Sequence, residues 1–127
     1  MINSVKKKVL IVEDEESLRS ILSDALVQKG VEVLQAKDGQ DGIIKATEEL
    51  PDLILLDILM PRMDGRAVLK LLRSNENTKN TPVIFLTNLN ELDTVSELVV
   101  GELVDYIVKS DWGIEEVVKK VLLKLGL

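Results

Sequence analysis

Continuous runs of branched apolar residues, without polar alternation, mark three places along the chain: Val9 to Val12, Leu53 to Leu56 and Pro82 to Leu86. Runs of this kind are typical of strands buried on both faces, as in the middle of a parallel sheet that helices cover. A strand at Val31 to Ala36 alternates between apolar and polar residues, which suits a position at or near a sheet edge. With a further apolar run at Val104 to Val108, the pattern predicts five strands.

Apolar residues at helical spacing lie between and after these strands. Strands and helices that alternate with short connections favour right-handed βαβ units and a parallel sheet with helices on both faces. Asp38 and Gly39 form a turn signal before the second helix. The five predicted helices are one bearing Leu18 to Leu26 and stopped by Gly30, one from about Gln40 to Leu50 ended by Pro51, one bearing Val68 to Leu72, one bearing Leu92 to Val99, and one from about Trp112 to Leu125.

Polar side chains follow four of the five predicted strands. Glu13 and Asp14 follow the first strand, Asp57 the third, Thr87 the fourth and Lys109 the fifth. The carboxyl ends of parallel strands lie at one edge of a sheet, and open α/β sheets bind their ligands there. The sequence therefore predicts a site at this edge, with Asp57 as its working group.

The loop after Asp57 is bracketed by Pro61 and Gly65. Proline fixes φ and glycine tolerates positive φ, so the chain after Asp57 is expected to form a tight loop instead of continuing as strand or helix.

Each of the residues at this edge also fits an ordinary structural role when it is taken alone. Asp57 suits a turn or cap, Glu13 and Asp14 suit a loop ahead of a helix, Thr87 suits a helix cap, and Lys109 suits a solvated surface. Their joint placement at the ends of neighbouring strands is what favours a functional site.

Composition narrows the chemistry. The chain has 127 residues, of which 46% are apolar and 30% are charged, a balance that fits one globular domain spanning residues 1–127. Neither cysteine nor histidine occurs, which excludes disulfides, thiolate or imidazole metal sites, and histidine-dependent catalysis.

Charge and hydropathy narrow the range of partners. The net charge of −6 and the presence of only three aromatic residues argue against direct binding of nucleic acid. There is no apolar run of about eighteen residues and no leader-like amino terminus, so we expect a cytoplasmic protein that does not enter membranes.

Bringing Glu13, Asp14 and Asp57 together requires compensating positive charge. At about 4 Å and an effective dielectric constant near 20, each like-charged pair costs roughly 4 kcal/mol. Lys109 supplies one positive charge, and a divalent cation would supply more. A cluster of carboxylate oxygens without histidine or cysteine suits Mg²⁺ or Mn²⁺, and Mg²⁺ commonly recruits a substrate phosphate.

With such a metal, Asp57 can attack a phosphoryl donor and form an aspartyl phosphate. The Thr87 hydroxyl and the Lys109 ammonium would stabilise the transferring oxygens. Binding of a nucleotide is disfavoured, because the loop after the first strand is acidic instead of glycine-rich.

These residues and their order resemble the receiver domain of bacterial two-component response regulators, the chemotaxis-regulator fold, across essentially the whole chain. The resemblance implies a flavodoxin-like, doubly wound parallel sheet of five strands in the order 2-1-3-4-5, with five helices. The motifs that carry it are Val12-Glu13-Asp14-Glu15, Leu55-Leu56-Asp57-Ile58-Leu59-Met60-Pro61, Met63-Asp64-Gly65, Leu86-Thr87-Asn88 and Asp105-Tyr106-Ile107-Val108-Lys109.

The resemblance also implies a metal site and a phosphate donor. Asp57 would accept phosphate from a phosphohistidine on a sensor histidine kinase or a histidine phosphotransfer protein. Asp14 and Asp57 would ligate Mg²⁺ directly, Glu13 would act largely through water, and the backbone carbonyl of Leu59 would complete the ligands that the protein supplies.

A switch follows from the same resemblance. Thr87 and Lys109 would bind the phosphoryl group, and Tyr106 would be the switch aromatic that reshapes the face of helix four, strand five and helix five. Tyr106 as a plain half-buried strand aromatic is equally compatible with the sequence. A monomer or a weak phosphorylation-dependent dimer is expected.

The chain departs from the family pattern after the fifth strand. Ser110 follows Lys109 where the family usually has proline, so a trans peptide bond is expected, since a cis bond without proline costs about 2.5 to 4 kcal/mol. Ser110 or Asp111 is expected to cap the last helix. Trp112 stands near a common phenylalanine and is expected to pack. Leu59 is apolar at a position that influences access of water, which predicts slower loss of phosphate than in a fast-cycling chemotaxis regulator.

Two other classes of function are less consistent with these residues. A metal-dependent phosphatase with an aspartate nucleophile on a related fold would need a second carboxylate two residues beyond Asp57, where Leu59 stands. An unphosphorylated interaction module would not need the complete acceptor set. Since the sequence ends just after the last predicted helix, output is expected through an unknown partner protein, unless the chain is an excised receiver domain.

Overall fold

A five-stranded sheet organises the structure, a computed structural model that describes residues 6–88, 97, 103–108 and 113–127. All paired strands run parallel, in the order β2-β1-β3-β4-β5. The predicted fold class and strand order are therefore confirmed. The strands are β1 (Lys8–Val12), β2 (Glu32–Ala36), β3 (Leu53–Asp57), β4 (Val83–Thr87) and β5 (Val104–Val108).

Four helices lie within the described part of the chain, where five were expected along the whole of it. The expected helix bearing Leu92 to Val99 falls outside the described residues, apart from Glu97. The four described helices are α1 (Glu16–Gln28), α2 (Gly39–Glu49), α3 (Gly65–Ser74) and α5 (Ile114–Lys124).

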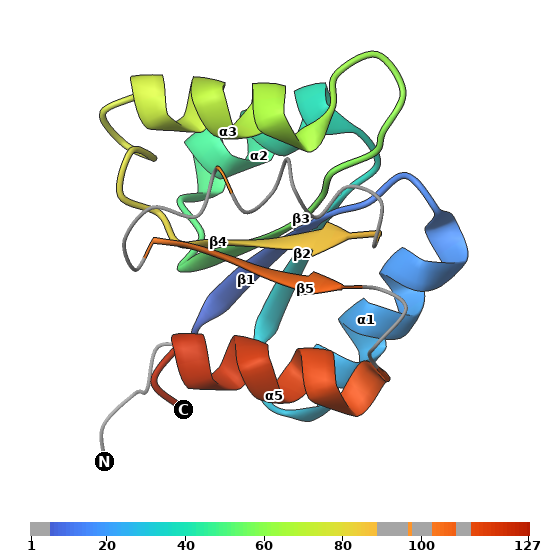
Figure 1. The fold of residues 1–127 in the computed structure, drawn as a ribbon. Helices are drawn as coiled ribbons and strands as arrows, with labels where there is room; N and C mark the ends of the chain where they lie inside the picture. The colour runs from blue at the N-terminus through green and yellow to red at the C-terminus, as the bar shows by residue number, and fades with distance from the viewer. Residues whose placement is uncertain (1–5, 89–96, 98–102, 109–112) are drawn as a thin grey trace.

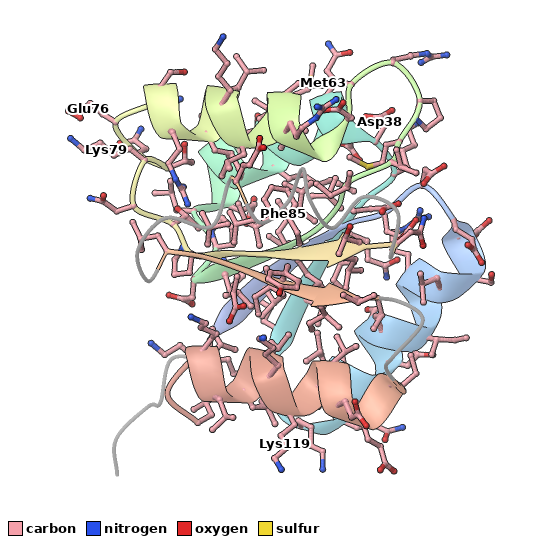
Figure 2. The ribbon with its side chains drawn as sticks, viewed as in Figure 1. Asp38, Met63, Glu76, Lys79, Phe85 and Lys119 are labelled. Carbon is pink, nitrogen blue, oxygen red and sulfur yellow. The ribbon has the colours of Figure 1, made fainter. Side chains whose placement is uncertain are left out.

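The helices cover both faces of the sheet, with α2 and α3 on one side and α1 and α5 on the other (Figure 1). Side chains of β1 alternate between the two layers: Leu10 and Val12 pack toward α2 and α3, whereas Val9 and Ile11 pack toward α1 and α5. Phe85 of β4 lies in the core on the α2 and α3 side (Figure 2). Two hydrophobic layers thus hold the sheet between them.

Burial of the strands follows the pattern of their side chains. Every residue of β3 and β4 is buried, as the unalternating apolar runs predicted. The alternating strand β2 lies at one edge of the sheet and exposes Glu32 and Gln35. The prediction of central and edge strands is confirmed.

Local backbone chemistry sets the ends of the first two helices. Gly30, with φ of +85°, follows α1, and Leu50, with φ of +48°, ends α2 just before Pro51. Asp38, which we interpreted as part of a turn, is the N-cap of α2, since its side chain accepts a hydrogen bond from the Asp41 N–H at 2.8 Å.

The start of α5 corrects one prediction. Its N-cap is Gly113, so the expectation that Ser110 or Asp111 caps this helix is wrong. Glu115 and Glu116 stand in its first turn, where carboxylates favour the positive end of the helix dipole. The expectations for the Lys109–Ser110 bond and for Trp112 fall on residues outside the described ranges.

Within those ranges, none of the helices has the length and apolar character that a bilayer-spanning segment needs.

Candidate functional site

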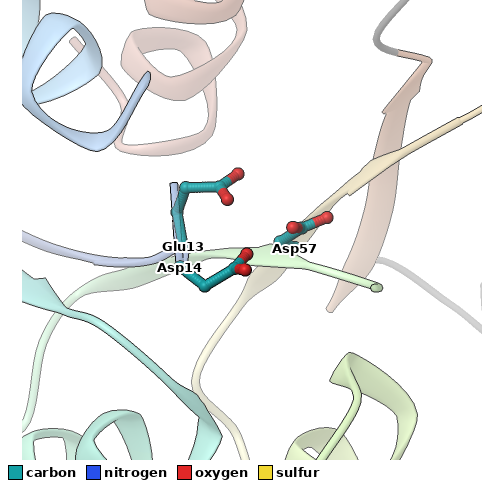
Figure 3. Close-up of side chains that lie close together, drawn as sticks. All are labelled: Glu13, Asp14 and Asp57. Atoms are coloured by element: carbon teal, nitrogen blue, oxygen red, sulfur yellow. The ribbon is translucent and has the colours of Figure 1, made fainter. Parts of the chain in front are cut away.

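Three carboxylates meet at the C-terminal ends of β1 and β3. One oxygen each from Glu13, Asp14 and Asp57 lie within 4.8 Å of one another (Figure 3). The parallel register that pairs Val12 with Leu56 places the residues after β1 beside Asp57. Glu13 and Asp57 are only 1% and 4% exposed, while Asp14 is exposed. The predicted convergence of these acids is therefore present.

Hydrogen bonds with three other residues hold the main chain and the side chain of Glu13. Its N–H donates to the Ala36 carbonyl of β2 at 3.1 Å. Its carbonyl accepts from Arg19 Nη1 of α1 at 2.7 Å, and its Oε2 accepts from the N–H of Glu15 at 3.0 Å. The buried acid is thus tied to the edge strand, to the first helix and to its own loop.

Asp57 is the last residue of β3, and the start of α3 packs directly on its main chain. The N–H of Gly65 donates to the carbonyl of Ile58 at 2.8 Å. A Cβ on Gly65 would lie 2.6 Å from the Asp57 carbonyl oxygen, closer than real side chains approach. Glycine is needed here for close approach and not for positive φ, contrary to our interpretation of this loop. The left-handed position is Arg62, with φ of +69°.

The rest of the loop after Asp57 is tight, as predicted. The Met63 N–H donates to the Pro61 carbonyl at 2.7 Å. Leu59 lies at the beginning of this loop with its side chain 49% exposed. The role of its carbonyl as a metal ligand stays a prediction, as does the slow loss of phosphate.

Asp64 is the N-cap of α3, a role that the sequence analysis did not identify. Its Oδ1 accepts from the N–H groups of Arg66 and Ala67 at 3.0 and 3.1 Å. Partial burial raises the pKa of the Asp64 carboxyl, but hydrogen bonds from the Arg66 side chain and the main chain outweigh burial, so the pKa lies below its usual value. A cap signal was available in the sequence, because aspartate directly precedes the apolar helix.

Thr87 ends β4 at the same edge of the sheet. It is 1% exposed, and its hydroxyl donates to the Asn88 carbonyl at 3.1 Å. It pairs in register with Val108, the last residue of β5. Lys109 follows Val108 directly and lies outside the described residues, so its predicted role is not tested.

Tyr106 is half-buried in β5 and packs against the core on the α2 and α3 side. This agrees with the plain interpretation of a strand aromatic, and the switch role stays a prediction. Lys120 of α5 donates to the Tyr106 carbonyl at 3.2 Å and pairs with Asp105 at 3.1 Å. Burial raises the pKa of Asp105, but the Tyr106 N–H and the two lysines Lys120 and Lys124 lower it overall.

The donor set at the acid cluster fits a hard divalent cation. The three side chains offer only carboxylate oxygens, which are the ligands that Mg²⁺ and Ca²⁺ prefer. Burial of Glu13 and Asp57 strengthens the repulsion between their charges, and a cation between them would offset it.

Comparison with known proteins gives a consistent result. The family model described as the response regulator receiver domain matches residues 9–122. A probable transcriptional regulator, ycf27, of Porphyra purpurea is 40% identical over 105 residues, which are 82% of this chain and 42% of the relative. The alkaline phosphatase synthesis transcriptional regulatory protein PhoP of Bacillus subtilis is 40% identical over 98 residues, or 76% of this chain and 40% of that protein.

Solved structures with the same fold include receiver domains and chemotaxis proteins. The receiver domain of the Francisella response regulator 1452 has a TM-score of 0.84 at 27% identity, covering 95% of this chain and 98% of that one. The chemotaxis response regulator CheY4 of Vibrio cholerae has a TM-score of 0.82 at 32% identity, covering 95% and 99%.

The chain spans about two fifths of the length of the curated relatives named above. The matched region contains every strand of the sheet apart from Lys8 and includes all three acids of the cluster. The chain therefore belongs to the response regulator receiver domain family and is a signalling domain of two-component regulation.

Proposed function

We propose that Asp57 is the phosphoacceptor of this receiver domain and that it takes its phosphoryl group from a histidine kinase or a histidine phosphotransfer protein. The observation that carries the proposal is the meeting of Glu13, Asp14 and Asp57 at one edge of the sheet. A lone aspartate at a strand end is commonly a turn residue, whereas three converging acids have no simple structural purpose.

Glu13, Asp14, Asp57 and the Leu59 carbonyl would hold Mg²⁺. When bound, Mg²⁺ offsets the charge of the acids and of the phosphoryl oxygens. A carboxylate oxygen of Asp57 attacks the phosphorus of the phosphohistidine, the phosphorus–nitrogen bond breaks, and the imidazole leaves with the electron pair of that bond. Thr87 donates its hydroxyl hydrogen to one phosphoryl oxygen, and Lys109 pairs with another.

The new charge at Asp57 would change the positions of residues on the neighbouring strands of the sheet. Thr87 ends the adjacent strand β4, and its hydroxyl, now on the Asn88 carbonyl, would turn to the phosphoryl group. Tyr106 stands on β5, the next strand, and would respond to that movement. The result is a switch of the face formed by β5, α5 and the helix expected before β5.

The module catalyses little beyond its own modification. Its output would pass to a partner protein that binds the switched face. The relatives named as transcriptional regulators are much longer than the stretch that they share with this chain. Output through a separate partner, without direct binding of nucleic acid by this domain, stays a prediction.

Incubation with acetyl phosphate and Mg²⁺, followed by intact-mass measurement, tests the proposal. We expect one phosphoryl adduct on the wild-type chain and on Asp52→Asn, an exposed acid at the opposite end of β3. Asp57→Asn should carry none. Absence of an Asp57-dependent adduct would falsify the proposal, and sustained turnover of a phosphoester would favour a metal-dependent phosphatase instead.

A further inference from the structure

Arg19 connects the acidic loop to the edge of the sheet. It lies near the start of α1 and is half-buried. Its Nη1 donates to the Glu13 carbonyl at 2.7 Å, and its Nε donates to the Gln35 side-chain oxygen on β2 at 3.2 Å. The guanidinium of this α1 residue thus links Glu13 of the acid cluster to the edge strand β2.

The partner of Arg19 on β2, Gln35, also contacts α1. The Gln35 side-chain nitrogen donates to the hydroxyl of Ser23, a residue of α1 that is only 6% exposed. Both ends of the Gln35 amide are therefore engaged, the nitrogen by Ser23 and the oxygen by Arg19. The planar fork of arginine, with donors at fixed angles, suits a contact to two separate acceptors.

From these contacts we propose that Arg19 is a positioning residue for the cation site, holding the main chain of Glu13 so that Glu13 and Asp14 stay beside Asp57. The inference rests on the proposed function only in assuming that the acid cluster binds Mg²⁺. Arg19 need not contact the cation or the phosphoryl group for this role.

The need for such an anchor follows from the charges of the cluster. The carboxylates come within 4.8 Å of one another, and mutual repulsion favours a loop that moves apart. The Glu13 N–H is bound to the Ala36 carbonyl of β2 on one side. Arg19 holds the carbonyl of the same residue on the other side, so the peptide planes on both sides of its Cα are fixed.

Two possible roles of Arg19, as a nearby positive charge and as a positioning residue, predict opposite effects of its replacement on Mg²⁺ binding. If the guanidinium acts mainly as a positive charge near the site, its removal should tighten the binding of Mg²⁺. If it acts by positioning, removal should weaken binding, as loss of residues that orient metal ligands commonly does by about tenfold or more. The sign of the change separates the two roles.

The structure offers a matched control in Arg73 of α3. Its guanidinium also donates to main-chain carbonyls, those of Thr78 at 3.2 Å and Leu103 at 3.4 Å. Arg73 is half-buried like Arg19. Its contact at Leu103 lies where β4 and β5 begin, at the opposite end of the sheet from the acids, because the Val83 N–H donates to that same carbonyl.

Calorimetric titration with MgCl₂ alone tests the proposal on the wild-type chain, Arg19→Gln, Arg19→Lys and Arg73→Gln. We expect the Mg²⁺ dissociation constant of Arg19→Gln to rise by about tenfold. Arg19→Lys should recover part of the loss, because one ammonium can reach the Glu13 carbonyl but not also Gln35. Arg73→Gln should keep the wild-type dissociation constant while losing thermal stability to a similar extent as Arg19→Gln.

A second measurement uses the rate of phosphorylation by acetyl phosphate as a function of Mg²⁺ concentration. Arg19→Gln should need more Mg²⁺ for half of its maximal rate, with a rate at saturation close to wild type. Should Arg19→Gln fail to fold, Gln35→Ala should raise the dissociation constant in the same direction by a smaller factor.

Tighter or unchanged Mg²⁺ binding in Arg19→Gln overturns the inference, as does an equal loss in Arg73→Gln or a wild-type chain that binds no Mg²⁺. A different result would refute the proposed function. A wild-type chain that binds Mg²⁺ but forms no adduct at Asp57 would refute phosphorylation and leave the role of Arg19 intact.

Discussion

Gly65 brings the first turn of α3 against the main chain of Asp57, and this contact leaves no room for a side chain. A Cβ there would lie 2.6 Å from the Asp57 carbonyl oxygen and 3.0 Å from the Cα of Ile58. Both atoms belong to the backbone and cannot rotate aside. The position of Asp57 thus depends on a glycine eight positions further along the chain.

We predict that Gly65→Ala destabilises the protein by about 1–3 kcal/mol, because the added methyl group forces α3 away from the end of β3. Urea denaturation followed by circular dichroism measures this change. Phosphorylation by acetyl phosphate should also slow, since Asp57 moves with its main chain.

Gly42→Ala provides the control for Gly65→Ala. A Cβ on Gly42 would lie 2.9 and 3.0 Å from the two γ carbons of the buried Val12, which are side-chain atoms instead of backbone. Gly42 lies inside α2, where alanine gains up to about 1 kcal/mol in helix propensity. We therefore expect a smaller loss than for Gly65→Ala, and an equal or larger one would contradict the argument from close approach.

Several site residues could be predicted from the sequence because they follow apolar strands directly. Glu13, Asp14, Asp57 and Thr87 needed only the rule that parallel strands end at one edge. The contact of Arg19 with Glu13 could not be predicted, because it depends on how α1 packs against β2. Periodicity reports which face of an element is buried, but not how closely two backbones approach.

At the scale of elements, the hydrophobic pattern predicted the strands well, because burial on two faces and burial on one face give different sequence patterns. The unbroken runs of β3 and β4 became fully buried strands, and the alternating β2 became an edge. Helix starts were predicted less well. They depend on which side chain or glycine takes the N-cap geometry, as Gly113 does for α5.

The start of α3 depends on Asp64, whose carboxylate accepts two main-chain hydrogen bonds of the first turn. We predict that Asp64→Ala destabilises the protein by about 1 kcal/mol at neutral pH, the usual effect of losing such a cap. Because the pKa of Asp64 is lowered in the folded state, its contribution is fully present above the unfolded value of about 3.8. It is lost as pH falls through the lower folded value.

The difference in unfolding free energy between wild type and Asp64→Ala should therefore shrink as pH falls below about 4. Asp64→Ser is the matched comparison, since a hydroxyl can cap the helix without titrating. It should stay close to wild type at neutral pH. A difference between wild type and Asp64→Ala that is constant down to the acid transition would show that the cap does not act through its charge.

At the scale of the whole molecule, the two hydrophobic layers make the acid cluster possible. The layers fix β1 and β3 from both sides, so the ends of these strands can carry carboxylates that repel one another. A protein without a binding function would gain stability by losing one of these charges. If the cluster binds Mg²⁺ as proposed, stability and binding oppose each other there, and that opposition can be measured.

We predict that Asp14→Asn stabilises the protein by about 1 kcal/mol when EDTA removes divalent cations, because Asp14 is the exposed member of the cluster and its repulsion is partly screened. Wild type should gain stability on addition of Mg²⁺, by about 2.7 kcal/mol at 100 times the dissociation constant, while Asp14→Asn should gain far less. The order of melting temperatures should therefore reverse between EDTA and saturating Mg²⁺. Asp24→Asn, an exposed acid of α1, should follow wild type in both conditions. If Asp14→Asn melts below wild type in EDTA, repulsion within the cluster does not limit stability, and if both gain equally from Mg²⁺, Asp14 is not a ligand.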